Sequence, residues 1–163
     1  MELHIGDPVM HWTYGLGQVV GLEERDFSGK TALYYAVKVN DMTVWVPADG
    51  NLADRLRPPT TASRFKQLFS ILSGSGEPLP EDRMERKARL MELLKDGRVE
   101  SLFQVIRDLS TYARNKALNE NDQLLLKRVQ NVLVGEWGFS LSIPVMQAES
   151  DLYRLLGSGT AGD

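Results

Sequence analysis

The chain has 163 residues, of which 42% are hydrophobic and 25% are charged, a composition typical of one or two small folded domains. The absence of cysteine excludes disulfide bonds, thiolate zinc sites and cysteine nucleophiles. A formal net charge of -3 excludes a protein that coats nucleic acid through its overall charge, so any DNA contact must be local.

The sequence also argues against a membrane protein or an exported one. No apolar run approaches the roughly 18 residues that a transmembrane helix requires. The first ten residues, MELHIGDPVM, lack the basic region followed by an apolar stretch that marks a signal peptide. We therefore expect a cytoplasmic protein of bacterial type with no membrane contact.

Residues 1–60 have the pattern of a small β domain. The apolar segments 33–39 (LYYAVKV) and 42–46 (MTVWV) flank the turn candidate Asn40-Asp41, which predicts a β-hairpin. Shorter strand candidates precede this hairpin, at 9–12 and 15–22. Four or five short strands joined by short turns predict a small, strongly bent antiparallel barrel.

From residue 61 onward the apolar spacing is helical. We expect a short helix over 63–72, then a glycine- and serine-rich break at 73–78 that we take as a domain boundary, so that 61–76 forms a helix and linker. Residues 77–157 form the helical domain, and 158–163 form a disordered tail. The predicted fold class is segregated α+β, with the barrel followed by an all-α bundle of about four to five helices.

The limits of these helices follow from local signals. The second helix covers about 80–95 and stops near Gly97, a left-handed cap, and the third covers 99–115. The fourth begins after Asn119, an N-cap with Asp122 three residues later, and the fifth runs from Ser142 to about Leu156. In the second helix we expect the core-facing residues to be Met84, Ala88, Met91 and either Leu94 or Lys95.

No catalytic or metal-binding constellation is found in the sequence. The histidines, His4 and His11, are seven residues apart in the β domain, which is not a zinc spacing, and we expect them at a strand surface or rim. The Gly15-Leu16-Gly17 segment lacks the third glycine and the following helix of a dinucleotide site. We expect neither enzymatic activity nor a cofactor.

The strongest local charge signal is basic. Residues 83–89 (RMERKAR) hold four basic side chains against one acidic side chain, and Arg83, Arg86 and Lys87 share one side of a helix. These cations suit phosphate contacts, as does a smaller basic spot at Lys127-Arg128. The alternative is a solvated helix face with intrahelical ion pairs.

Aromatic residues are dense in the β domain: Trp12, Tyr14, Tyr34, Tyr35 and Trp45. Alternation places Tyr34 and Tyr35 on opposite faces of one strand, so at least one of them faces outward unless it is covered. Exposed aromatic side chains favour a protein interface. The alternative is a barrel whose outer face packs on the first helix through Phe65 and Phe69.

An ordered series of motifs resembles the CarD/CdnL family of bacterial transcription regulators over about residues 3–156. The series comprises Ile5-Gly6-Asp7-Pro8-Val9, Tyr14–Val20, Glu23-Glu24-Arg25, Tyr34-Tyr35, Met42–Pro47, Leu56-Arg57, Val105–Leu109 and Leu125–Glu136. The first part is also similar to the polymerase-interacting domain of transcription-repair coupling factors, and the helical second half favours the CarD-like proteins.

The resemblance implies a Tudor-like barrel that docks on the RNA polymerase β subunit by edge-strand pairing. By the resemblance, Arg25 matches a β-contacting arginine, and Trp45 stands where the family has a second arginine. We take Arg25, Trp45 and Tyr35 as the polymerase-binding candidates.

For the helical domain, the resemblance implies contact with promoter DNA at the upstream edge of the bubble. A family tryptophan that wedges into the minor groove is replaced here by Arg83, and Arg86 and Lys87 fall in or beside the family's basic DNA-contacting segment. The DNA-binding candidates are therefore Arg83, Arg86, Lys87, Lys127 and Arg128.

We expect a transcription regulator that modulates open-complex stability and contacts promoter DNA weakly, because tethering to the polymerase replaces intrinsic affinity. We expect a monomer, with a dimer through the barrel edge left open. The alternative is a protein-interaction adaptor with a polymerase-binding barrel and no direct DNA contact.

Overall fold

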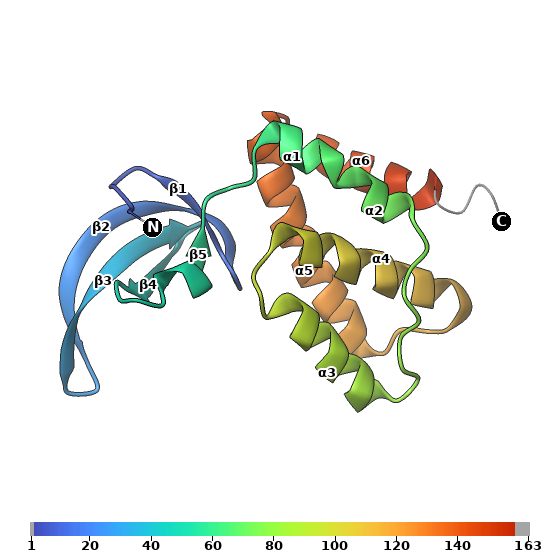
Figure 1. Cartoon of the computed structure of the whole chain (residues 1–163), viewed down its shortest axis with the longest axis horizontal. Helices are drawn as coiled ribbons and strands as arrows, with labels where there is room; N and C mark the ends of the chain where they lie inside the picture. Colours follow the sequence, from blue (N-terminus) through green and yellow to red (C-terminus); the bar gives the residue numbers. More distant parts are fainter. Residues whose placement is uncertain (1, 159–163) are drawn as a thin grey trace. The chain divides into compact units, whose positions relative to one another are not determined.

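The computed structural model describes residues 2–158 and divides the chain into two compact units, Met1–Pro59 and Thr60–Asp163 (Figure 1). The first unit contains the strands and the second contains the α-helices, so the segregated α+β class is confirmed. The expected tail, 158–163, lies outside the described residues except for Ser158, which ends the last helix.

The first unit is one antiparallel sheet of five strands in the order β4-β3-β2-β1-β5. The strands are β1 (Pro8–His11), β2 (Gly15–Phe27), β3 (Lys30–Val39), β4 (Met42–Pro47) and β5 (Leu56–Arg57), with a single 3-10 turn at Leu52–Asp54. The predicted hairpin is confirmed, because β3 pairs with β4 and Asn40 turns the chain with φ 55°.

Alternating valines and leucines build the core on the inner face of this sheet. The buried members are Val9, Val19, Val37, Val39, Val46, Leu52 and Leu56. Gly17 is needed where β2 crosses this core, because a Cβ there would lie 2.8 Å from both the Lys38 carbonyl oxygen and a Val39 methyl group. A register shift between Val19 and Gly21 bends β2, and Figure 1 shows the resulting curvature.

The curved sheet stays open. In the order of strands that residues 2–158 form, β4 and β5 are the two ends, and β4 is paired with β3 alone. The outer backbone groups of β4 therefore form a free edge.

The second unit is a helical bundle. Its helices are α1 (Ala62–Gln67), α2 (Phe69–Ser73), α3 (Arg83–Leu94), α4 (Val99–Asn115), α5 (Glu120–Leu141) and α6 (Val145–Ser158). Leu68 alone separates α1 from α2, so these two short helices replace the single first helix that we expected. None of the helices within residues 2–158 is long and apolar enough to cross a membrane.

The bundle core is built around Trp137 on α5. The rings of Phe65, Phe69 and Phe103 lie 5.5, 4.7 and 6.3 Å from the Trp137 ring. Phe65, Leu68 and Leu72 are all buried in this cluster. Residues 61–73 are therefore part of the helical core rather than a helix and linker outside it, and Phe65 and Phe69 serve that core.

Two local anchors fix the ends of segments in this unit. Asn119 caps α5 by accepting a hydrogen bond from Asp122 N at 2.8 Å, while the Asp122 carboxylate accepts one from Asn119 N, which confirms the predicted capping. Thr60 donates hydrogen bonds from N and Oγ1 to the buried carboxylate of Glu136, at 2.9 and 2.8 Å. Glu136 thus attaches Thr60, which follows Pro58-Pro59, to α5.

Candidate functional site

The outer face of the sheet brings Arg25 and Trp45 together from different strands. Arg25 pairs with Ala32 and Trp45 pairs with Ala36, so all four side chains share the face opposite the valine core. The Arg25 guanidinium carbon lies 4.3 Å from the centre of the Trp45 ring, a cation-π contact, and the Arg25 side chain keeps 44% of its surface exposed. Strand β4, which carries Trp45, is also an end strand of the sheet with a free edge.

Two further aromatic residues lie on this face: Phe27, which was not singled out in the sequence, and Tyr34, which was noted there as an aromatic residue but not taken as a polymerase-binding candidate. Phe27 lies edge-on to Tyr34 at 5.0 Å, and Arg25 lies 5.8 Å from the Phe27 ring. The set of Arg25, Phe27, Tyr34 and Trp45 is called the aromatic face below. Strand alternation together with the register of the β2–β3 hairpin could have identified both residues.

Tyr35, our third polymerase-binding candidate, lies on the other face. It pairs with Leu22 and Val46, and its side chain packs against the valine core of the sheet. Tyr35 is therefore separated from Arg25 and Trp45 by the sheet itself.

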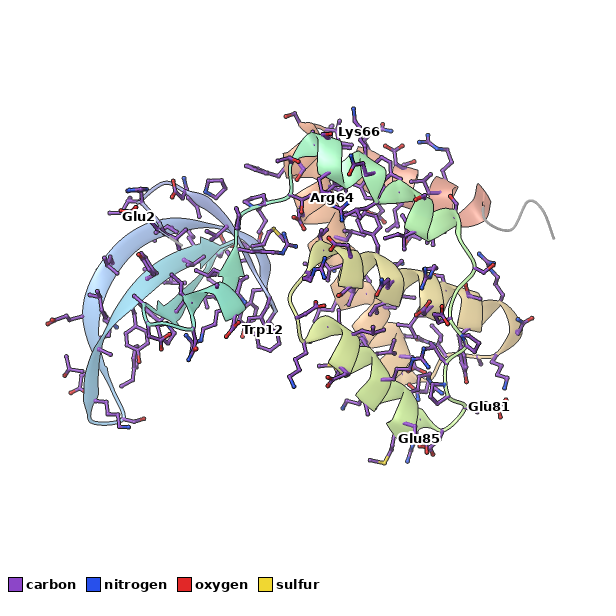
Figure 2. All side chains as sticks on the ribbon, viewed as in Figure 1. Glu2, Trp12, Arg64, Lys66, Glu81 and Glu85 are labelled. Carbon is purple, nitrogen blue, oxygen red and sulfur yellow. The ribbon has the colours of Figure 1, made fainter. Side chains whose placement is uncertain are left out.

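A different exposed aromatic group lies at the turn between β1 and β2. Trp12 projects from this turn and is 50% exposed (Figure 2). His11 beside it is buried rather than at a surface, and its Nδ1 accepts hydrogen bonds from Thr13 N and Tyr14 N, at 3.1 and 3.2 Å. Desolvation by burial lowers the pKa of His11 below its ordinary 6.5.

The candidate DNA-binding residues divide into three groups. Arg83 and Lys87 on α3 and Arg128 on α5 are exposed and line one open groove of about 850 Å³. Lys127 is exposed on α5 but does not line this groove. Arg86 is buried, with only 3% of its surface exposed.

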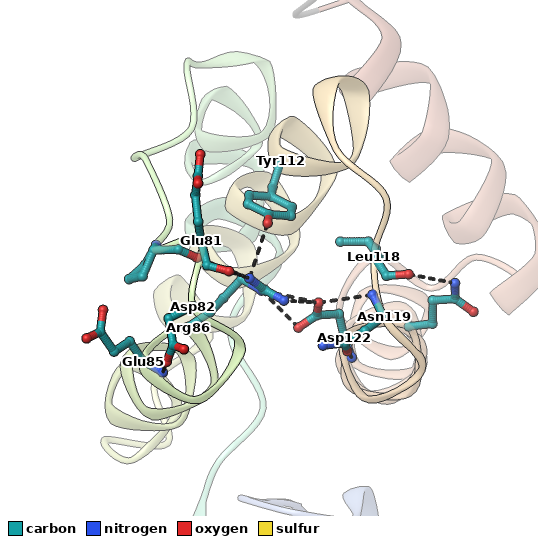
Figure 3. Close-up of polar contacts among 10 residues, drawn as sticks. Glu81, Asp82, Glu85, Arg86, Tyr112, Leu118, Asn119 and Asp122 are labelled. Atoms are coloured by element: carbon teal, nitrogen blue, oxygen red, sulfur yellow. Dashed lines mark hydrogen bonds and ion pairs between the residues drawn. The ribbon is translucent and has the colours of Figure 1, made fainter.

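Arg86 was expected on an exposed basic arc, and that expectation was wrong. Its Nη2 donates to Asp122 Oδ2 at 2.7 Å, and its Nε donates to both Asp122 oxygens at 3.2 Å (Figure 3). Its Nη1 donates to the carbonyl oxygens of Pro80 and Glu81 and to the Tyr112 hydroxyl, at 3.1, 3.0 and 3.2 Å. All of its polar nitrogens are engaged within the protein, so Arg86 cannot contact phosphate.

The ion pair between Arg86 and Asp122 is buried, and each charge is balanced by the other. The hydrogen bonds to Asp122 raise the pKa of Arg86 above its ordinary value, so the guanidinium stays charged. The Tyr112 ring lies 4.8 Å from the guanidinium carbon and covers one side of it. The pair links α3 to the first turn of α5.

Most of the face of α3 that we expected in the core is turned outward, although Leu94, one of the two alternatives for its last residue, is buried. Arg86, Leu90 and Leu94, spaced four residues apart, are the buried residues of α3. Met84 is 74% exposed and Met91 37% exposed, and both line the groove with Ala88. The physical reason is the Arg86–Asp122 pair, which holds the other side of the helix against the bundle.

The groove has both cationic and apolar lining residues. Its apolar lining comes from Met84, Ala88, Met91, Leu124 and Leu125, and its polar lining from Arg83, Lys87, Asn119, Asn121, Asp122 and Arg128. Among the ion pairs that residues 2–158 form, none includes Arg83, Lys87 or Arg128. The one carboxylate of the lining, Asp122, is neutralised by Arg86.

Across residues 2–158 the structure brings together no group of three histidine, aspartate or glutamate side chains that could hold a metal ion. The surfaces that remain are suited to binding: an aromatic face with a central arginine beside an open strand edge, and a cationic groove.

Comparisons with known proteins agree with this arrangement in both units. The CarD-like/TRCF RID domain matches residues 3–58, and the CarD C-terminal domain matches residues 67–153, more than half of the chain. A similar protein is the "Putative transcription factor YdeB" of Bacillus subtilis (strain 168), which is 27% identical over 135 residues that cover 81% of this chain and 88% of that protein. The chain therefore belongs to the CarD-like family of transcription regulators, a family of transcription factors rather than enzymes.

Proposed function

We propose that the protein regulates transcription by docking on the β subunit of RNA polymerase through the aromatic face and the free edge of β4. The observation that carries this proposal is the exposed Arg25 guanidinium stacked 4.3 Å above Trp45, next to a strand that is paired on one side only. Proteins of the CarD-like family interact with RNA polymerase, which supports the assignment.

The free edge of β4 and the aromatic face would make different contributions to polymerase binding. A free strand edge supplies main-chain donors and acceptors for a strand of the partner, which gives affinity with little sequence selectivity. Side chains on one face then provide selectivity, and tryptophan, tyrosine and arginine are the residue types that dominate interface energies. Arg25 stacked on Trp45 presents a planar cation held in place before the partner arrives, which lowers the ordering cost.

In this proposal the helical unit contacts promoter DNA near the upstream edge of the bubble and modulates the stability of the open complex. Arg83, Lys87, Arg128 and Lys127 are exposed and supply the phosphate contacts. Four cations on a chain of net charge -3 give little affinity for free duplex, so the contact depends on tethering to the polymerase. The protein acts as a cytoplasmic monomer bound to polymerase.

The docking half of the proposal is tested by Arg25→Glu, with Arg89→Glu on the exposed side of α3 as a matched charge reversal. We expect Arg25→Glu to abolish co-purification of the tagged protein with RNA polymerase, because the substitution places a carboxylate over the Trp45 ring. Arg89→Glu should leave recovery unchanged. Equal recovery of both variants would remove Arg25 from the interface, and circular dichroism of each variant shows that it is folded.

A further inference from the structure

We propose that the groove between α3 and α5 binds an acidic amphipathic helix of another protein. The groove is lined by one stripe on each helix: Arg83, Met84, Lys87, Ala88 and Met91 on α3, and Asn121, Leu124, Leu125 and Arg128 on α5. Within each stripe every residue lies three or four positions from another member, so each stripe follows one side of its helix. This binding does not depend on the proposed contact with DNA, although it uses three of the same cations.

The apolar lining shows that the groove is more than a basic surface. Met84 is 74% exposed, Met91 37% and Leu124 63%, an unusual exposure of three large apolar side chains around one concavity. Methionine side chains are flexible and polarizable, and they are characteristic of grooves that accept peptide side chains. A ligand that covers them removes this surface from water.

The charged residues of the groove indicate that the ligand is negatively charged. Arg83, Lys87 and Arg128 line the groove together with the apolar residues, and none of the three has an ion-pair partner among residues 2–158. Asp122, the one carboxylate of the lining, is already paired with Arg86 and does not offset the three cations. The groove therefore matches a ligand that presents both apolar side chains and carboxylates on one side, as an acidic amphipathic helix does.

The walls decide the backbone conformation of the ligand. Both walls are helices, whose own backbone groups are hydrogen-bonded within the helix, so they offer no main-chain partners to an extended peptide. An extended peptide would leave its own donors and acceptors unpaired in an apolar groove, whereas a helix satisfies them internally. From Arg83 to Met91 the wall rises about 12 Å, which corresponds to two to three turns of a bound helix.

The same lining disfavours nucleic-acid bases. Sites that hold unstacked bases use aromatic rings as stacking platforms. The lining residues include no phenylalanine, tyrosine, tryptophan or histidine. The cations can contact phosphate, but the apolar lining has the chemistry of an interface for aliphatic side chains.

The test uses the full chain and a fluorescein-labelled synthetic helix of about 16 residues, with leucine at positions i, i+4, i+7 and i+11 and glutamate on both flanks. We expect saturable binding by fluorescence anisotropy with a dissociation constant of about 10–100 μM at low salt. The same peptide with lysine in place of glutamate, and a scrambled peptide of identical composition, should each bind at least about tenfold more weakly.

Matched variants locate the site on the protein. Leu124→Gln and Arg128→Glu should each weaken the glutamate peptide about fivefold or more. Two controls on the same helix are Phe139→Gln, an exposed apolar residue outside the groove, and Lys127→Glu, the cation next to Arg128 that does not line it. Both controls should bind the peptide as the unmodified protein does.

Several outcomes would overturn the inference. No binding of the glutamate peptide at about 1 mM, equal binding of the scrambled peptide, or equal effects of the two controls would each remove the peptide site. Binding of an oligothymidylate that depends on Leu124 would assign the groove to single-stranded DNA. A concentration-dependent dimer lost in Leu124→Gln would assign it to a second copy of the chain. None of these results changes the expected loss of polymerase binding in Arg25→Glu.

Discussion

At the start of α5, a single carboxylate has two structural roles. Asp122 accepts the hydrogen bond from Asn119 N that completes the capping box. It also accepts hydrogen bonds from Nε and Nη2 of Arg86. A buried ion pair of this kind contributes little net stability relative to an apolar pair, but removal of one partner leaves an uncompensated charge. Arg86 and Asp122 are only 4% and 5% exposed at their side chains, so this penalty applies to them.

We therefore predict that Arg86→Met destabilises the helical unit by about 3–5 kcal/mol. Urea unfolding followed by far-ultraviolet circular dichroism measures this change. Arg83→Met, three residues earlier and exposed, should change the free energy of unfolding by less than about 0.5 kcal/mol. The double variant Arg86→Met with Asp122→Asn should recover part of the loss, since the amide keeps a capping oxygen and removes the charge. An Arg86→Met variant as stable as Arg83→Met would contradict this account.

His11 makes the stability of the sheet unit depend on pH. Its neutral ring accepts two backbone hydrogen bonds at Nδ1, and protonation of that nitrogen would break both. Because burial lowers the pKa of His11 in the folded state, the unfolded chain binds the proton more readily. The stabilising contribution is fully present above the unfolded pKa of 6.5 and is lost as the pH falls through the lower folded pKa.

We predict that the free energy of unfolding of the sheet unit decreases between about pH 7 and pH 5, by at most about 1.4 kcal/mol per pH unit for one proton. Urea unfolding followed by tryptophan fluorescence reports it, because Trp12 lies 6.2 Å from His11. His11→Asn should flatten this dependence, while His4→Asn at an exposed site should preserve it. A slope that survives His11→Asn would assign the pH effect to other groups.

At the scale of elements, features specified by neighbouring residues were predicted correctly. The hairpin around Asn40, the cap at Asn119, the left-handed Gly97 and the limits of α4 all depend on residues close in the chain. Each signal is local, so the sequence contains all of it.

Features specified by distant partners were not predicted. The buried side of α3 is selected by Arg86 and Asp122, which are 36 residues apart, and both sides of α3 carry apolar residues. The membership of residues 61–73 in the bundle depends on Trp137, which is more than sixty residues further along. Tyr34 and Tyr35 were known to face opposite ways, but which of them joins Arg25 depends on the register of β2.

The whole molecule carries the two proposed binding surfaces on different units, and the proposed DNA contact is tested with both units present. We predict that Arg83→Ala with Lys87→Ala shortens the lifetime of polymerase–promoter open complexes about threefold to tenfold, through the loss of two phosphate contacts. Arg86 is excluded from this variant because its loss would disturb the fold. The measurement is the decay of heparin-resistant complexes formed with the full chain.

Arg89→Ala, on the same helix but outside the groove, is the matched control for this measurement. An unchanged lifetime in the double variant, with intact polymerase binding, would favour the adaptor, in which the helical unit binds protein and not DNA. Raising the salt concentration should reduce the difference between the double variant and the unmodified protein, because phosphate contacts weaken as counterions are added.

The linker between the two units is very short. Only Pro58 and Pro59 stand between Arg57, the last strand residue, and Thr60, which Glu136 secures through two hydrogen bonds. Three peptide links of about 3.8 Å each span at most about 11 Å, and each proline has a restricted φ. In the proposed complex, docking of the sheet unit on the polymerase therefore also keeps Thr60, the first residue of the helical unit, within about 11 Å of the end of β5.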